Sequence, residues 1–288
     1  MYYKILHFIS TILLLFINIL INILNMTQKL AETNIDLKNI ENICLKDYED
    51  MDETALRIQL AASYRIIESL GWSYLIFGHL TVRLPGPKNH FLINPFGLMY
   101  DEVTASNLVK IDLDGNIIGN SEWGINPAGF IIHSSIHSSK EDAHCVMHTH
   151  TTAGMAMAAL AKGLINIDFN GTSFHNKVSY HDFEGVTIRK EECERLANDL
   201  GNNSVMILKN HGLLTTGKTI AEAFIKLYTL ENACKVQLLA RASGEKLEEV
   251  PIKIAENHIK GLNNSGNAKL AYKALVRKAL KKDPSFIY

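Results

Sequence analysis

Between residues 52 and 250, short apolar runs of strand length alternate with helical segments, and this alternation limits the possible folds most strongly. The pattern predicts helices at 52–70, 130–139, 152–162, 191–200 and 219–242. It predicts strands at 79–84, 90–95, 108–118, 145–150, 178–183, 186–190 and 204–210. Strands and helices interleave without a repeat or a low-complexity linker, so we expect one α/β domain over residues 52–250.

Local signals mark several of these boundaries. The first helix begins among acidic residues and ends before Gly71. Thr219 and Glu222 have the spacing of a capping box, which predicts the start of the long helix there. Asp114-Gly115 lies between two β-prone runs and predicts a hairpin turn.

Composition excludes several classes of protein. The chain has 288 residues and a net charge of −1, which gives no support for a nucleic-acid partner. Its four cysteines are scattered and form no CxxC pair. This usage favours reduced thiols in a cytoplasmic compartment, with neither a disulfide framework nor a cysteine-type zinc site.

The first 25 residues form a separate hydrophobic segment. Residues 5–24 contain no Asp, Glu, Lys or Arg and have the length of a membrane-spanning helix. His7, Asn18 and Asn22 weaken that interpretation, and Met26 offers a second start. The segment is therefore either an anchor or a misassigned extension, and we expect membrane contact only in the first case. Residues 26–51 form a polar lead-in.

Residues 251–288 form the predicted C-terminal tail, with a helix over 267–282. Basic side chains recur every four residues along this helix, at Lys269, Lys273, Arg277 and Lys281. The spacing favours a solvated face opposite an apolar one that packs on the domain or on another subunit. A basic helix on a membrane surface is the alternative.

The stretch CVMHTHTTAG at 145–154 places two histidines two residues apart. On a strand, His148 and His150 point to the same side, about 7 Å apart along the chain. Two neutral imidazoles at that spacing can bind one metal ion. A chance pair is the alternative, because the chain contains 12 histidines.

A third histidine strengthens the metal interpretation. His211 follows the apolar strand at 204–209, and Gly212 after it lets the backbone turn away. Three histidine ligands with one open position are typical of catalytic zinc sites. Otherwise His211 is a turn residue that bonds to a carbonyl.

Three motifs, HTHTTAG at 148–154, KNHGLLTTG at 209–217 and INPAGFIIHSSIH at 125–137, together resemble the class II aldolase and adducin family, in its adducin-type branch. The resemblance runs from about 55 to 245 and includes FLINPFGLMYDEVT at 91–104 and YHDFEG at 180–185. It implies a three-layer α/β/α sandwich around a largely antiparallel sheet, often assembled as a tetramer. It also implies one zinc ion held by His148, His150 and His211.

The chain departs from the family's sugar-phosphate aldolases at the acidic residue that completes the metal site. That position is Gly129, four residues before the helix histidine His133. The family's phosphate-binding positions also differ, with only Gly97 kept and the others replaced by His79, Phe96, Pro127 and Ala128. We therefore expect no phosphorylated sugar bound in the family's usual way, because apolar side chains offer phosphate no donors.

The leading hypothesis is a zinc-dependent lyase of class II aldolase type, acting on a small hydroxy-carbonyl compound. Epimerisation, dehydration and decarboxylation on the same site remain open. The other hypothesis is an adducin-like scaffold without turnover, with or without the metal. Candidate proton carriers are His133, His137, Tyr180, His181 and Glu184. Each also has a structural interpretation: His133 and His137, for example, share one helix face.

Overall fold

The computed structural model describes residues 12–14, 17, 37–86, 89–185, 191–262 and 267–288. The chain divides into two units, Met1–Ile40 and Glu41–Tyr288. Residues 12–14 and 17 are helical and exposed, and the rest of the predicted hydrophobic segment lies outside the described residues. Within the described ranges, none of the helices has the length and apolar character needed to cross a membrane.

A seven-stranded sheet lies at the centre of the second unit, with the strand order β3-β2-β1-β4-β7-β6-β5. Five neighbouring pairs are antiparallel, and only β5 and β6 run parallel. The prediction of a largely antiparallel sheet is therefore confirmed. The strands are β1 (His79–Arg83), β2 (Phe91–Ile93), β3 (Val109–Ile111), β4 (Cys145–Thr149), β5 (Val178–His181), β6 (Val205–Leu208) and β7 (Gly212–Gly217).

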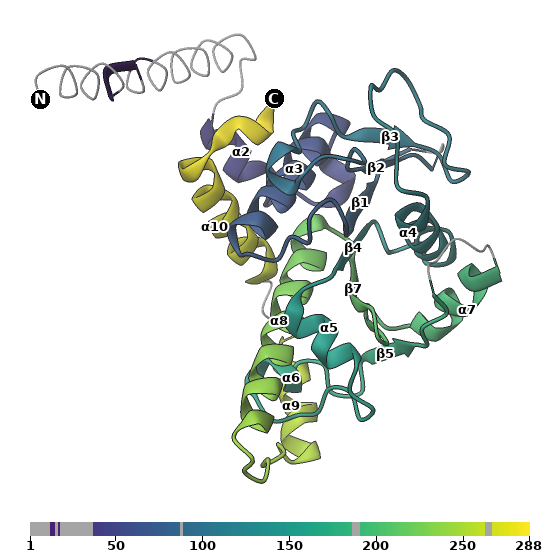
Figure 1. The fold of residues 1–288 in the computed structure, drawn as a ribbon, viewed down its shortest axis with the longest axis vertical. Helices are drawn as coiled ribbons and strands as arrows, with labels where there is room; N and C mark the ends of the chain where they lie inside the picture. Colours follow the sequence, from purple (N-terminus) through teal and green to yellow (C-terminus); the bar gives the residue numbers. More distant parts are fainter. Residues whose placement is uncertain (1–11, 15–16, 18–36, 87–88, 186–190, 263–266) are drawn as a thin grey trace, which may run out of the picture. The chain divides into compact units, whose positions relative to one another are not determined.

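Helices cover both faces of the sheet, as Figure 1 shows. One face carries α4 (Pro127–Ser139) and α7 (Glu191–Leu200), which pack on each other and on the strands. The other carries α3 (Glu53–Ser69), α5 (Thr152–Ala158) and α8 (Ile220–Ala242). This arrangement confirms the predicted three-layer α/β/α sandwich.

Strand register assigns His148, one of the three predicted metal ligands, to the α4/α7 face. His148 lies opposite Leu214, and Leu214 lies opposite Met206. Residues directly opposite each other share a face of the sheet. Leu214 and Met206 pack with Ile132 of α4 and Leu196 of α7 in one buried apolar cluster. The side chain of His148 therefore points toward these two helices.

The helix caps agree with the sequence signals in most respects. Asp52 caps α3 by accepting a hydrogen bond from the Ala55 amide. Thr219 caps α8 and accepts from the Glu222 amide, as predicted. The second half of the expected capping box differs, because the Glu222 carboxylate accepts from the Lys218 amide and not from Thr219.

Other elements differ in extent from the prediction. The strand expected at 108–118 ends at Ile111, and a turn through Asp112–Asn116 leads to one bridge between Ile111 and Ile117. The helix expected at 152–162 ends at Ala158. The short helices α2 (Leu37–Ile43), α6 (Phe169–Thr172) and α9 (Ile252–Leu262) had no signal that we recognised. The strand predicted at 186–190 lies outside the described residues.

The C-terminal helix α10 (Asn267–Lys282) packs against α3 and α8. Tyr272 is fully buried, and its hydroxyl donates to the Gln59 carbonyl and bonds to the Ser63 hydroxyl. The basic row is not simply a solvated face. Lys269, Lys273 and Arg277 contact polar side chains in the segment 41–47, namely Asp47, Asn42 and Glu41.

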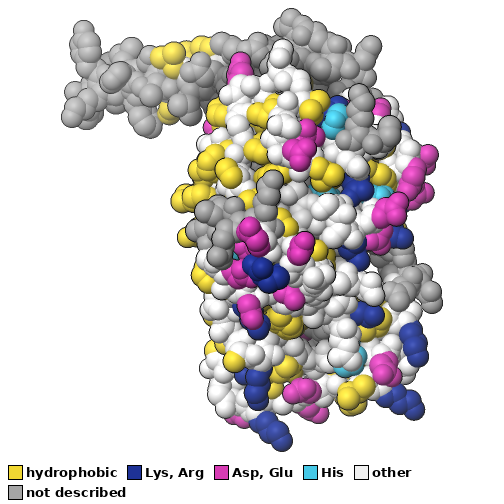
Figure 2. Space-filling model, turned by 90° about the vertical axis from the view of Figure 1, so that its right-hand side faces the viewer, with side chains coloured by type: hydrophobic (Ala, Val, Ile, Leu, Met, Phe, Trp, Pro, Cys, Tyr) yellow, Lys and Arg dark blue, Asp and Glu magenta, His cyan; other side chains and the backbone are white. Residues whose placement is uncertain are grey.

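The surface over the α4/α7 side of the sheet carries both signs of charge. Figure 2 shows Lys and Arg side chains interspersed with Asp and Glu among the described residues of this face. Arg195 of α7 and Glu184 form one ion pair, joined by two contacts of 2.6 Å.

Candidate metal centre

Three histidine side chains converge at one end of the central strands. Nε2 of His150 lies 2.8 Å from Nε2 of His148 and 2.9 Å from Nε2 of His211. The three ring centroids are 4.6–4.8 Å apart. Among the described residues, this is the one cluster of three His, Cys, Asp or Glu side chains whose ligand atoms lie close enough to share an ion.

The turn between β6 and β7 positions His211. Asn210 adopts a left-handed backbone with φ of 57°, and the His211 amide donates to the Leu208 carbonyl. Gly212 serves this turn by its size, not by the backbone freedom that the sequence suggested. A Cβ there would collide with the Thr149 carbonyl and lie 3.2 Å from the ring of His150.

The hydrogen bonding of His148 prepares its ring for a metal. Nδ1 lies 2.9 Å from the Leu213 carbonyl, which can only accept, so Nδ1 carries the proton. Nε2 therefore presents a lone pair to the other two histidines. A carbonyl partner on the distal nitrogen is a common way to orient a metal-binding histidine.

Burial keeps all three imidazoles neutral. It lowers the pKa of His148 well below the usual value, that of His150 to about 4, and that of His211 in the same direction. Neutral imidazole is the form that binds metal. Three converging neutral rings fit a divalent ion such as zinc, which would keep an open position for substrate.

His79 also lies at this centre, although the sequence analysis did not place it there. It lies directly opposite His148 across the β1–β4 pair, so both side chains share one face. Its two ring nitrogens are buried and have no hydrogen-bond partner. Burial lowers its pKa to about 3, with smaller contributions from His150 and His211. The pairing of β1 with β4 could not be read from sequence spacing.

A chain of polar side chains joins α4 to β1 beside this centre. The hydroxyl of Thr81 lies 2.7 Å from Nδ1 of His133 and 2.7 Å from Nε2 of His137. Nδ1 of His137 lies 2.8 Å from the Ala143 carbonyl. Nε2 of His133 is buried without a partner, and its ring centroid lies 6.1 Å from that of His79.

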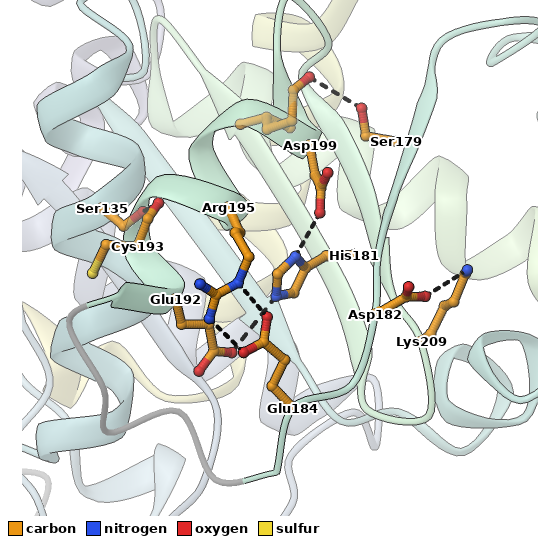
Figure 3. A network of polar contacts seen from close by, with 11 residues as sticks. Ser135, Ser179, His181, Asp182, Glu184, Glu192, Cys193, Arg195, Asp199 and Lys209 are labelled. Carbon is orange, nitrogen blue, oxygen red and sulfur yellow. Dashed lines mark hydrogen bonds and ion pairs between the residues drawn. The ribbon is translucent and has the colours of Figure 1, made fainter.

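Figure 3 shows a second polar network, and some of its residues lie close to His211. His181 bonds through Nδ1 to the exposed carboxylate of Asp199 at 2.7 Å, and its Nε2 lies 3.6 Å from the buried Glu192. Glu184 pairs with Arg195. His181, Glu184 and Glu192 line a small pocket together with His211. Glu192 had no sequence signal, because it lies in a helix start rich in acidic residues.

Tyr180 lies apart from the predicted metal ligands. It precedes His181 on β5, so its side chain points to the opposite face of the sheet. Its hydroxyl accepts from the Leu164 amide at 3.0 Å, and its ring packs against Gly163. This position gives no support for proton transfer at the histidine cluster.

The residues that the sequence analysis matched to the family's phosphate positions offer few donors. Pro127 opens α4, and the Ala128 amide already donates to the side chain of Asn126. Phe96 is partly exposed, and its amide donates to the Gly124 carbonyl. The start of α4 is therefore capped by its own chain.

Comparison with known proteins agrees with this fold. The sequence model of a protein family, the class II aldolase and adducin N-terminal domain, matches residues 58–238. A Pseudomonas aeruginosa protein, named provisionally as a class 2 aldolase, is 42% identical over 240 residues, covering 81% of this chain and 92% of its own. Rat alpha-adducin is 42% identical over 223 residues, 76% of this chain but only 30% of the adducin.

A solved structure extends the comparison to an enzyme. The L-fuculose 1-phosphate aldolase of Glaciozyma antarctica is 30% identical, with a TM-score of 0.74 over 81% of this chain and 92% of that one. Fold and histidine cluster thus define an α/β/α domain with the architecture of class II aldolases. The chain belongs to the class II aldolase and adducin family.

Proposed function

We propose that this protein is a zinc-dependent lyase of class II aldolase type that acts on a small hydroxy-carbonyl compound. The convergence of three neutral imidazoles, His148, His150 and His211, is the observation that carries the proposal. A bound zinc ion would polarise a carbonyl oxygen and stabilise the negative charge that develops when a C–C bond breaks. The three rings would hold the ion and leave one coordination position open for the substrate.

His133 is the proposed proton carrier. Its Nε2 atom is buried without a partner on the face that carries His148. Burial lowers the pKa of His133 well below its usual value, which keeps the ring neutral with a lone pair on one nitrogen but also makes it a weaker base. His137 uses both ring nitrogens in hydrogen bonds and so has none left for a substrate.

His181 and Glu184 are weaker candidates for this role. They line the pocket beside His211, which supports a place near the substrate. Glu184 is held in a two-fold contact with Arg195, and His181 is held by Asp199. We assign both residues a structural role, which is to hold the wall of the pocket next to His211 in place. Tyr180 has no part in the proposal.

The proposed substrate carries hydroxyl and carbonyl groups and no phosphate bound in the family's usual way. The family's phosphate positions here are His79, Phe96, Pro127 and Ala128, and the Ala128 amide is occupied by the helix cap. Neutral histidines such as His79 suit hydroxyl oxygens better than a dianion. Epimerisation, dehydration or decarboxylation would use the same arrangement.

An adducin-like scaffold without turnover is the second candidate. The similarity to alpha-adducin over 76% of this chain favours it, and so does the absence of a side chain at Gly129. Both candidates allow a bound metal. Only substrate turnover separates them.

We also propose that the protein forms a homo-oligomer, with a tetramer as the expected state, in the cytoplasm. Tyr74, Leu75 and Phe77 form an exposed apolar turn, and Tyr74 lies 5.8 Å from the ring of His150. Such a turn beside a site suits a subunit contact. The four cysteines are scattered and form no CxxC pair, which suits a reducing compartment. Mass photometry would give the oligomeric state.

The test is a screen of zinc-loaded protein for aldol cleavage of small hydroxy-aldehydes and hydroxy-ketones, with and without phosphate. We expect turnover of an unphosphorylated compound that His211→Ala abolishes together with zinc binding. His133→Asn should keep the zinc and lose at least about a hundredfold in rate. Full zinc loading with no turnover across the screen would favour the scaffold.

A further inference from the structure

Four groups beside the predicted metal centre form a continuous buried hydrogen-bond chain. It runs from the Ala143 carbonyl through His137 and Thr81 to His133. Thr81 and the two histidines are at most 2% exposed, so no bulk water competes for these bonds. The three contacts measure 2.7–2.8 Å.

The chemistry of the groups fixes the direction of every bond in this chain. The Ala143 carbonyl has no hydrogen, so Nδ1 of His137 must donate to it. Burial lowers the pKa of His137 to about 3, which makes its ring neutral at physiological pH. Its Nε2 therefore carries no hydrogen and accepts from Thr81.

The same reasoning then fixes the proton of His133. Thr81 has a single hydroxyl hydrogen, and this hydrogen goes to His137. The Thr81 oxygen can only accept from its second partner, so Nδ1 of His133 must be the donor. In a neutral His133 ring, the lone pair is then on Nε2, the atom that is buried without a partner.

We propose that Thr81 and His137 are positioning residues that hold His133 in its Nδ1–H tautomer and so keep a lone pair on Nε2, the atom to which the proposed function assigns proton transfer. The proposal deepens the proposed function, because it names what prepares the proton carrier. The free imidazole has two tautomers of similar energy, and a hydrogen bond on one nitrogen selects between them. A carbonyl fixed in the backbone thus sets the protonation of a side chain three hydrogen bonds away.

The fold explains why these residues meet. His133 and His137 are four residues apart on α4, so they share one helix face. Thr81 lies opposite Val146 on the β1–β4 pair, on the face that α4 covers. It is also two residues from His79, so both side chains point to α4. The hydroxyl sits between two rings one helical turn apart.

Nitrogen NMR on the full chain with ¹⁵N-labelled histidine tests the tautomer directly. His133→Asn identifies the signals of His133, and the zinc-loaded protein keeps the sample diamagnetic. We expect a protonated, pyrrole-type Nδ1 and an unprotonated, pyridine-type Nε2 on His133. The reverse pattern would overturn the proposal. The NMR measurement does not depend on enzyme activity.

Two substitutions at Thr81 test the positioning role. Thr81→Val keeps the branched shape but removes the hydroxyl, so we expect a mixture of His133 tautomers and at least a tenfold loss in kcat/KM, with zinc content unchanged. Thr81→Ser restores the hydroxyl and should retain the tautomer and most of the activity. If Thr81→Val retains the single Nδ1–H tautomer, the chain does not set it.

The two proposals fail in different ways. The predicted tautomer without turnover of any substrate would refute the lyase and leave the hydrogen-bond chain established. Turnover with a protonated Nε2 on a neutral His133 would keep the lyase and refute the role of Thr81 and His137. If Thr81→Val does not fold, the spectrum of the unchanged protein still decides the tautomer.

Discussion

The ring of His79 lies directly against the backbone of Gly129. A Cβ at residue 129 would be 2.5 Å from Nδ1 of His79 and 2.6 Å from its Cγ, closer than real Cβ atoms come. The two residues therefore occupy one shared volume. An acidic side chain at residue 129 and an imidazole at residue 79 exclude each other in this geometry.

The first prediction concerns that shared volume. Gly129→Ala should destabilise the protein by about 1–3 kcal/mol, because the new methyl group overlaps a buried ring. The cost should be smaller in a His79→Ala background, where the ring is gone. Urea unfolding of the two single variants and the double variant measures the coupling. Additive effects would mean that the two sites do not share space.

This contact also affects any attempt to restore the acid. Gly129→Glu alone should fold poorly, so its inactivity would say nothing about the chemistry. The informative variant is the double substitution with His79→Ala, compared with His79→Ala alone. Circular dichroism and zinc content should be measured on both before activity is compared.

The second prediction concerns Gly212. Gly212→Ala should destabilise the fold by roughly 1–3 kcal/mol and weaken zinc binding, because the Cβ meets the Thr149 carbonyl and approaches the ring of His150. Gly261→Ala is the matched control: it lies in α9 with nothing within 4 Å of its Cβ. That change should be neutral or stabilise by about 0.5–1 kcal/mol. Equal effects of the two substitutions would contradict the account of the turn.

The third prediction concerns pH. Burial puts the pKa of His137 at about 3 in the folded protein, below the value of about 6.5 expected in the unfolded chain. Between these values the unfolded state binds more protons, so stability is present above pH 6.5 and is lost as pH falls toward 3. One such histidine lowers the free energy of unfolding by about 2 kcal/mol between pH 7 and pH 5.

Urea unfolding at pH 7 and pH 5, with a chelator present so that metal release does not contribute, checks this. His137→Gln removes one titrating group and should reduce the pH dependence. His133, His148 and His79 are also buried with lowered pKa values, so a fall should remain in the variant. Equal stability at both pH values would refute the assignment of neutral buried rings.

The fourth prediction concerns the C-terminal helix. Tyr272→Phe should cost about 1 kcal/mol, because it removes the hydroxyl that bonds to Ser63 and to the Gln59 carbonyl. Tyr272→Ala should cost about 3–5 kcal/mol through the cavity it leaves. Lys281→Ala, on an exposed position of the same helix, should change stability little. Thermal unfolding of the three variants checks these values. An effect of Tyr272→Ala as small as that of Lys281→Ala would mean that the helix is only loosely attached.

Local periodicity predicted the alternation of strands and helices, whereas the three layers and the shared ion of the three histidines were implied by the resemblance of several motifs to the class II aldolase and adducin family. His148 and His150 are two residues apart on one strand, and His211 follows a strand that ends in a turn. The opposition of His79 to His148 depends on the pairing of β1 with β4, which are more than 60 residues apart in the chain. No local pattern encodes that pairing.

The hydrogen-bond partners were beyond prediction for the same reason. The spacing of His133 and His137 shows that they share a helix face, but only the packed structure brings Thr81 between them. Tyr180 and His181 looked equivalent in the motif YHDFEG, yet strand alternation separates them onto opposite faces of the sheet. Because the two residues are adjacent on one strand, only His181 lies on the face of the histidine cluster.

The central claim is that His148, His150 and His211 bind one metal ion. Metal content by mass spectrometry, on the full chain purified without added metal and beside His148→Ala and His211→Ala, tests it most directly. His258→Ala, at a half-buried histidine outside the cluster, is the control. The account predicts about one zinc per chain in the unchanged protein and the control, and none in the two cluster variants with their fold intact. No bound metal in the unchanged protein, and no uptake when zinc is added, would contradict it.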